Sequence, residues 1–86
     1  MSRRPDAGDG DEAVVASLDC RGLLCPLPAR ETRRALAALA SGDVLRVVCT
    51  DPVSMIDLRA LCDETGDEIL EARAAAPLYL FRIRKR

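Results

Sequence analysis

The side chains best suited to chemistry in this chain are those of its four cysteines, at positions 20, 25, 49 and 62. Pro26 follows Cys25 directly, and Pro28 comes two residues later. Proline is tolerated in the first turn of a helix, where the N–H group that it lacks would have no partner. The motif therefore predicts that Cys25 lies at the start of a helix. Unpaired N–H groups and the helix dipole favour negative charge there, so we expect a thiol that ionises easily and reacts as the thiolate.

A second thiol, that of Cys20, lies five residues before Cys25 and just after a predicted strand. Its C-x4-C spacing differs from the C-x2-C of thioredoxin-like motifs, but the intervening loop could bring the two residues within disulfide range. Cys20 is therefore a candidate accessory thiol, and a thiol–disulfide redox module that uses Cys20 and Cys25 is an alternative function. Cys49 and Cys62 are predicted to pack in the core, which is the common fate of a free cysteine.

Residue types that the chain lacks narrow the chemistry further. Without histidine there is neither a Cys–His pair nor a Ser–His–Asp triad. The cysteine spacings match no zinc pattern, so no metal site is expected, and there is no glycine-rich phosphate loop. A single activated thiol without a general base fits the transfer of sulfur or electrons between proteins better than the turnover of a small molecule. A persulfide is one of the reversible states of a cysteine thiolate.

Length and charge limit the kinds of partner. The 86 residues predict one domain, and the net charge of −1 gives no reason to expect general affinity for nucleic acids. The C-terminal residues 82–86 are basic, but the chain has no RNA-binding motif, so direct contact with RNA is not expected.

The N-terminal residues and the apolar segments bear on location. Residues 1–12 are charged and lack an apolar region, so we interpret them as a disordered leader and not as a signal peptide. No apolar run is long enough to span a membrane, and no membrane partner is expected. We therefore expect a cytoplasmic protein, whose thiols stay reduced.

Apolar periodicity and turn residues predict six elements in the order β-α-β-α-β-β. The strands are expected at residues 13–18, 44–49, 68–73 and 78–84, and the helices at 26–40 and 52–65. Asp51 is predicted to be the N-cap of the second helix and Pro52 its first residue, and Asp57 is interpreted as an acid that the helix dipole favours. Strand–helix–strand units form right-handed crossovers, which place both helices on one side of the sheet. The prediction is an α+β fold: a two-layer α/β sandwich with two helices on one face of a four-stranded mixed sheet.

Side chains near Cys25 are candidates for partner docking. Leu24 and Leu27 flank the cysteine, although both could instead be half-buried, as single leucines at a surface often are. Arg30, Arg33 and Arg34 lie within two turns of Cys25 and could steer an acidic partner or favour the thiolate. A solvated helix face is the alternative interpretation of these arginines.

Several stretches of the chain match one known family. Cys25 to Pro28 fit its CPxP motif. The match continues at Leu18-Asp19, Arg21-Gly22-Leu23, Thr50-Asp51-Pro52, Asp57 and residues 79–84. In these residues the chain resembles the TusA/SirA-like sulfur carrier proteins. The resemblance covers about residues 14–86, so residues 13–86 are expected to form one TusA-like sulfur carrier domain.

The resemblance implies a role for Cys25. It implies the β-α-β-α-β-β sandwich, in which Cys25 carries sulfane sulfur as a covalent persulfide and no other cofactor is needed. Gly22, Pro26 and Pro28 would support the turn that presents this residue. The protein would then be a sulfurtransferase-type carrier rather than an independent turnover enzyme.

The resemblance also implies partners. A cysteine desulfurase or a rhodanese-like protein would load the carrier, and a sulfur-accepting protein would unload it for tRNA thiolation, molybdenum-cofactor synthesis or sulfur oxidation. A small carrier that docks on several proteins is expected to be a monomer. Leu24 and Leu27 stand where some members have a basic residue and an acid, which predicts a more apolar docking surface. A regulatory binding module with an incidental cysteine is a further alternative.

Overall fold

The structure is a computed structural model that describes residues 14–86. It contains six elements in the predicted order: β1 (Val14–Cys20), α1 (Leu27–Ala37), β2 (Val44–Cys49), α2 (Ser54–Thr65), β3 (Glu68–Ala75) and β4 (Leu78–Arg84). The predicted leader, residues 1–12, lies outside the described residues. Within the described part of the chain, neither helix is long and apolar enough to cross a membrane.

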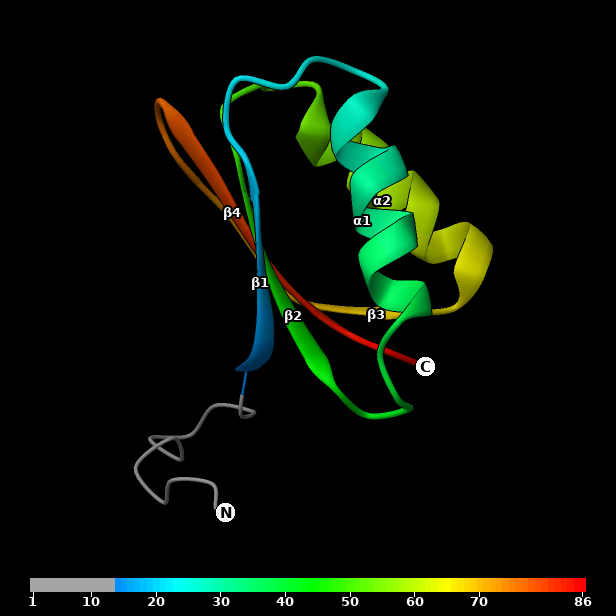
Figure 1. Ribbon diagram of the computed structural model, residues 1–86. Helices are drawn as coiled ribbons and strands as arrows, with labels where there is room; N and C mark the ends of the chain where they lie inside the picture. The colour runs from blue at the N-terminus through cyan, green and yellow to red at the C-terminus, as the bar shows by residue number, and fades with distance from the viewer. Residues whose placement is uncertain (1–13) are drawn as a thin grey trace.

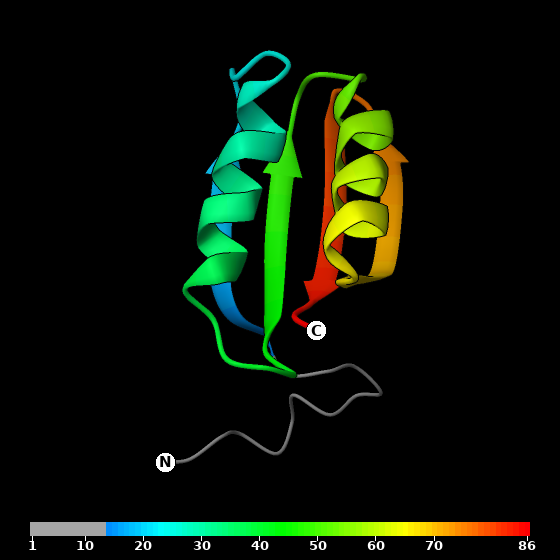
Figure 2. The same ribbon diagram turned by 90° about the vertical axis from the view of Figure 1, so that its right-hand side faces the viewer.

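The four strands form one mixed sheet in the order β1-β2-β4-β3. β1 runs parallel to β2, whereas β4 runs antiparallel to both of its neighbours. Both helices cover the same face of this sheet, α1 on the side of β1 and β2, and α2 on the side of β4 and β3 (Figures 1 and 2). Right-handed crossovers from β1 to β2 and from β2 to β3 require this placement. The predicted two-layer sandwich is confirmed.

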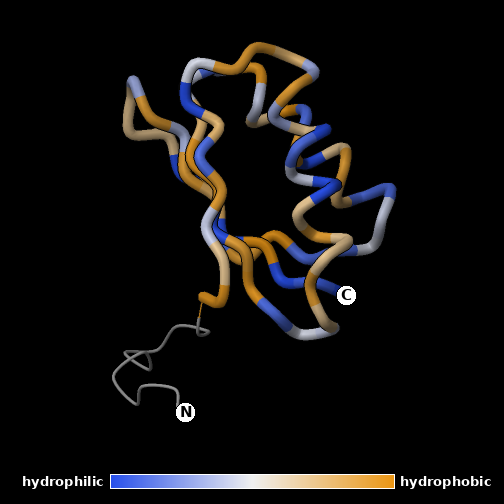
Figure 3. The backbone as a smooth tube through the Cα atoms, viewed as in Figure 1, coloured by the Kyte–Doolittle hydropathy of each residue, from blue (hydrophilic) through white to orange (hydrophobic). Residues whose placement is uncertain are grey.

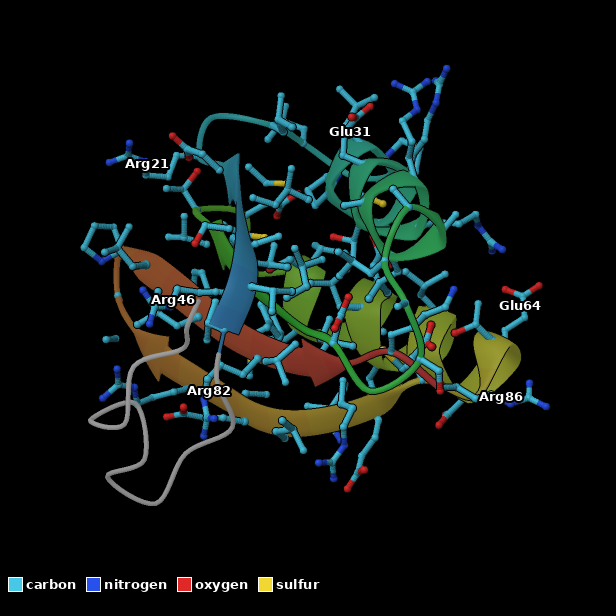
Figure 4. All side chains as sticks on the ribbon, turned by 60° about the horizontal axis from the view of Figure 1, so that its bottom comes forward. Arg21, Glu31, Arg46, Glu64, Arg82 and Arg86 are labelled. Atoms are coloured by element: carbon cyan, nitrogen blue, oxygen red, sulfur yellow. The ribbon has the colours of Figure 1, made fainter. Side chains whose placement is uncertain are left out.

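The core is mostly aliphatic and fills the space between the sheet and the helices. Its buried side chains include Leu36 of α1, Leu45, Val47 and Cys49 of β2, Leu58, Leu61 and Cys62 of α2, and Phe81 and Ile83 of β4. Cys49 and Cys62 are therefore core residues, as predicted. Arg46 and Arg82 alternate with these positions along β2 and β4, and they project from the sheet face opposite the helices (Figure 4).

Several element boundaries differ from the prediction. α1 begins at Leu27 rather than at residue 26, and β3 ends at Ala75 rather than at residue 73. β1 extends two residues further, so Cys20 belongs to the strand and not to the loop after it. α1 ends at Ala37 rather than at residue 40, because the next residues leave the helix through a tighter turn in which the Leu39 N–H donates to the Leu36 carbonyl at 3.0 Å. α2 begins at Ser54, and Val53 instead of Asp51 occupies the N-cap position.

Candidate functional site

Cys25 lies in the loop that joins β1 to α1, two residues before α1 begins, and its side chain is exposed. The first turn of α1 closes on the motif: the Leu27 N–H donates to the Leu24 carbonyl at 2.8 Å, and the Arg30 N–H donates to the Pro26 carbonyl at 3.1 Å. Pro28 is buried, so the second proline of the motif anchors the helix start in the core. The cysteine is thereby held at the mouth of α1, and this end of the helix lies at the top of the molecule in Figure 1.

Two backbone hydrogen bonds hold this loop against the segment after β2. The Gly22 N–H donates to Thr50 Oγ1 at 2.9 Å, and the Cys25 N–H donates to Asp51 Oδ2 at 2.9 Å. The two segments meet because β1 and β2 are parallel neighbours and end at the same edge of the sheet. Gly22 has φ +82°, in the left-handed region where a side chain is strained. Gly22 therefore supports the turn through its backbone conformation.

The Asp51 carboxylate accepts hydrogen bonds from the segments that precede both helices. Its Oδ2 accepts from Cys25, while its Oδ1 accepts from the Val53 N–H at 3.0 Å. The prediction that Asp51 is the N-cap of α2 is therefore wrong by two residues. The carboxylate instead stabilises the turn before α2 and, with its other oxygen, fixes the backbone of Cys25.

The electrostatics of the thiol are opposite to the expectation. A hydrogen bond to the Asp57 carboxylate, then desolvation by the neighbouring residues, then charge repulsion from Asp57 and Asp51, raise the pKa of the Cys25 thiol above its usual value. The helix start contributes little compensation, because the Cys25 N–H is already bonded to Asp51 and the two prolines of the motif have no N–H. The resting thiol is therefore protonated at neutral pH, and the predicted easily ionised thiol is wrong for the isolated protein.

A groove of about 410 Å³ runs from Cys25 between the two helices. It is lined by Cys25, Pro26, Ala29, Arg30, Arg33, Asp57, Ala60, Leu61 and Glu64. Arg33 of α1 and Glu64 of α2 form an ion pair across it at 3.0 Å. The Asp57 Oδ2 atom is buried and has no hydrogen-bond partner within residues 14–86. Asp57 is thus a site residue that the sequence analysis assigned to the helix dipole, although its match to the family was a usable signal.

The docking candidates do not all lie at the site. Leu24 and Leu27 are both exposed beside Cys25, Leu24 more than Leu27. Arg30 lines the groove, but Arg34 does not; Arg34 lies 3.7 Å from Glu31, its neighbour on the same helix. The arginine that joins Arg30 in the groove is Arg33.

Cys20 is fully buried at the end of β1, where the strand register pairs it with Cys49. Burial, followed by charge repulsion from Cys49 and a hydrogen bond with it, raises the pKa of Cys20 to about 12. All four cysteines, which lie within the described residues, are free. A redox pair with Cys25 would require the Cys20 thiol to leave the core, so the geometry offers no support for the accessory role.

The family model described as "Sulfurtransferase TusA" matches residues 16–85. The chain belongs to the TusA family. It is 41% identical over 68 residues to the sulfur carrier protein TusA of Allochromatium vinosum, which covers 79% of this chain and 90% of that protein. It is 39% identical over 71 residues to the sulfur carrier protein TusA of Pseudomonas entomophila, which covers 83% of this chain and 89% of that one. The resemblance to TusA/SirA-like proteins is confirmed.

A solved structure supports the TusA-family fold. The crystal structure of a SirA-like protein from Desulfitobacterium hafniense superposes with a TM-score of 0.71 and 24% sequence identity. The match covers 80% of this chain and 95% of that one. At this level of identity the comparison supports the shared fold and carries no information about the partners.

Proposed function

We propose that this protein is a sulfur carrier that holds sulfane sulfur as a covalent persulfide on Cys25. The observation that carries the proposal is that Cys25, within the CPxP motif, is the one exposed cysteine of the four. The relatives named as sulfur carriers point to the same role. The other three thiols are buried in the core, so a protein partner can reach sulfur only at Cys25.

The transfer exchanges one disulfur bond for another. The Cys25 thiolate attacks the terminal sulfur of a donor persulfide, R–S–SH, and the S–S bond of the donor breaks. The sulfur atom bonded to R leaves with the electron pair of the broken bond, and it takes up the proton that Cys25 lost. The balance is R–S–SH + Cys25–SH → R–SH + Cys25–S–SH, without net oxidation, and the acceptor repeats it in reverse.

The donor and the acceptor are part of the proposal. Carriers of the TusA family act with other proteins, and we assign a cysteine desulfurase or a rhodanese-like protein as donor. A component of the tRNA thiolation machinery is the acceptor that we favour. The proposal includes a cytoplasmic location, because a carrier thiol must not be lost to stable disulfides. Direct contact with RNA is not required: Arg82 and Arg84 are bonded to Glu71 and Glu68 at 3.0 and 2.9 Å.

Mass spectrometry of the intact protein tests the proposal. Incubation with a cysteine desulfurase and cysteine, or with polysulfide, is expected to add one sulfur atom to the wild-type chain and none to Cys25→Ser. The variant keeps the three buried thiols, so it also controls for sulfur bound elsewhere. A wild-type chain that gains no sulfur from either source would exclude the carrier role. Loading that persists in Cys25→Ser would assign the sulfur to another residue.

A further inference from the structure

Exposed large apolar side chains gather around Cys25. Within residues 14–86 five such side chains are exposed: Val15 (55%), Leu24 (68%), Leu27 (37%), Val53 (43%) and Ile56 (70%). Val15 lies on β1, but the other four come from the two segments that meet at Cys25. We call Leu24, Leu27, Val53 and Ile56 the apolar rim. Exposed apolar residues are ordinary when scattered, whereas a cluster marks an interaction surface.

Backbone contacts place the two halves of the apolar rim on either side of the thiol. Leu24 and Leu27 flank Cys25 in the chain. The Val53 N–H donates to the same Asp51 carboxylate that accepts from Cys25. The Ile56 N–H donates to the Val53 carbonyl at 3.0 Å, so Ile56 lies on the next turn. Figure 3 shows the β1–α1 loop as largely hydrophobic at the end of the molecule where both helices begin.

The centre of the apolar rim is acidic. Asp57, the residue after Ile56, lines the groove next to Cys25, and its Oδ2 atom is buried without a hydrogen-bond partner in the described chain. A carboxylate whose hydrogen bonds are incomplete costs free energy, and a cationic side chain that enters the groove would recover part of it. The surface is therefore complementary to an apolar patch that carries a positive charge.

We propose that the apolar rim binds the sulfur-donating protein through an apolar surface that surrounds its persulfide and directs one cationic side chain at Asp57. The proposal rests on the carrier function and names the chemistry of the donor. Pairing of Asp57 with a cation would remove the largest cause of the raised pKa of the Cys25 thiol, so a larger fraction of the thiol ionises when the donor docks. The free carrier would then be protected from unspecific oxidation and alkylation.

Matched charge insertions test the surface. Ile56→Glu places a carboxylate in the apolar rim, whereas Val15→Glu places one on a comparably exposed valine of β1. Each variant is loaded from three donors: a cysteine desulfurase with cysteine, a rhodanese preloaded with sulfur, and polysulfide. With the protein donors we expect Ile56→Glu to load about tenfold slower or more, equivalent to about 1.4 kcal/mol, because a charge is forced into an apolar contact. Val15→Glu is expected to load like the wild type.

The polysulfide reaction separates this proposal from the carrier function. If the wild type gains no sulfur even from polysulfide, the carrier function fails and the docking surface with it. If polysulfide loads every variant but Ile56→Glu accepts sulfur from the protein donors as fast as Val15→Glu, the apolar rim is not the docking surface. Slow loading of Ile56→Glu from polysulfide as well would place the effect on the thiol, and it would also overturn the proposal. The proposal would also be overturned if the wild type gained sulfur no faster from the protein donors than from polysulfide.

Asp57→Asn tests the cationic contact. Removal of the carboxylate is expected to lower the pKa of the Cys25 thiol and to speed its alkylation by iodoacetamide at pH 7. Loading from the protein donor is expected to slow in the same variant, because the cationic side chain loses its partner. If alkylation and protein-dependent loading both become faster, Asp57 acts on the thiol alone and the cationic contact is refuted.

Discussion

Replacing Gly22 by alanine tests whether the loop of Cys25 is held by its hydrogen bonds or by the backbone freedom of glycine. Gly22 has φ +82°, and no atom lies within 4 Å of the position that a Cβ would occupy. The substitution therefore introduces backbone strain without a steric clash. Gly42, with φ +91° and equally free space, is a matched control outside the site. Both N–H groups donate across the chain, that of Gly22 to Thr50 at 2.9 Å and that of Gly42 to Lys85 at 2.8 Å.

The expected magnitude follows from the conformation. A left-handed backbone costs an alanine about 1–2 kcal/mol, and about 0.4–1 kcal/mol of this is offset because alanine has less freedom in the unfolded chain. The net loss of about 1 kcal/mol corresponds to a decrease in Tm of about 4–8 °C for a domain of this size. The two bonds of the loop contribute about 0.5–1.5 kcal/mol for the Thr50 hydroxyl and about 1.5–3 kcal/mol for the charged Asp51. Since their sum exceeds the strain, the loop is expected to stay in place.

Urea unfolding measures the predicted loss of stability, and the rate of alkylation of Cys25 reports whether the loop stays in place. Gly22→Ala and Gly42→Ala are expected to lose the same free energy of unfolding, and Gly22→Ala is expected to react with iodoacetamide at the wild-type rate. A Gly22→Ala protein as stable as the wild type would show that the left-handed conformation is not needed. A loss above about 3 kcal/mol, or a changed alkylation rate, would show that the loop has left its hydrogen bonds.

Two further predictions concern the thiols and the pH dependence of stability. In the native protein one thiol, that of Cys25, is expected to react with a chromogenic disulfide reagent, and all four after unfolding; a second fast thiol in the native state would contradict the buried positions of the others. Arg82 lowers the folded-state pKa of Glu71 below its usual 4.5, so this carboxylate stabilises the protein above that pH and the contribution is lost as the pH falls through the lowered value. Urea unfolding at pH 6 and pH 3 should therefore show a smaller acid-induced loss in Glu71→Gln, and an equal loss would refute the assignment.

The order of elements could be predicted because local signals agree with the tertiary structure. The mostly apolar run of β2 indicates a central strand, as the sheet order confirms, and Gly66 ends α2 in the left-handed conformation expected of a helix-terminating glycine. The alternation of Ala16, Leu18 and Cys20 would also have placed Cys20 on the buried side of β1. The turn-forming residues around Cys20 obscure this signal, so the predicted strand ends two residues before the observed one.

The protonation state of Cys25 could not be predicted from the local sequence. The motif indicates a helix start, and a helix start favours a thiolate. Asp51 and Asp57 lie 26 and 32 positions further along the chain, and only the parallel pairing of β1 and β2 brings them against the thiol. Long-range contacts of this kind have no periodicity that a single sequence reveals, whereas the exposure of Cys25 follows from its own neighbours.

The hydrogen bonds that fix the Cys25 loop use backbone N–H groups, so they do not depend on whether the Cys25 side chain carries sulfur. Addition of sulfur changes the side chain of Cys25 and leaves the bonds from Gly22 and Cys25 to Thr50 and Asp51 in place. The empty and the loaded carrier therefore present the same frame to every partner. A donor that must select the empty form, and an acceptor that must select the loaded form, have to distinguish them by one sulfur atom and its charge, next to two carboxylates. The direction of sulfur transfer then depends on the sulfur bound to Cys25 and not on a change in the backbone of the carrier.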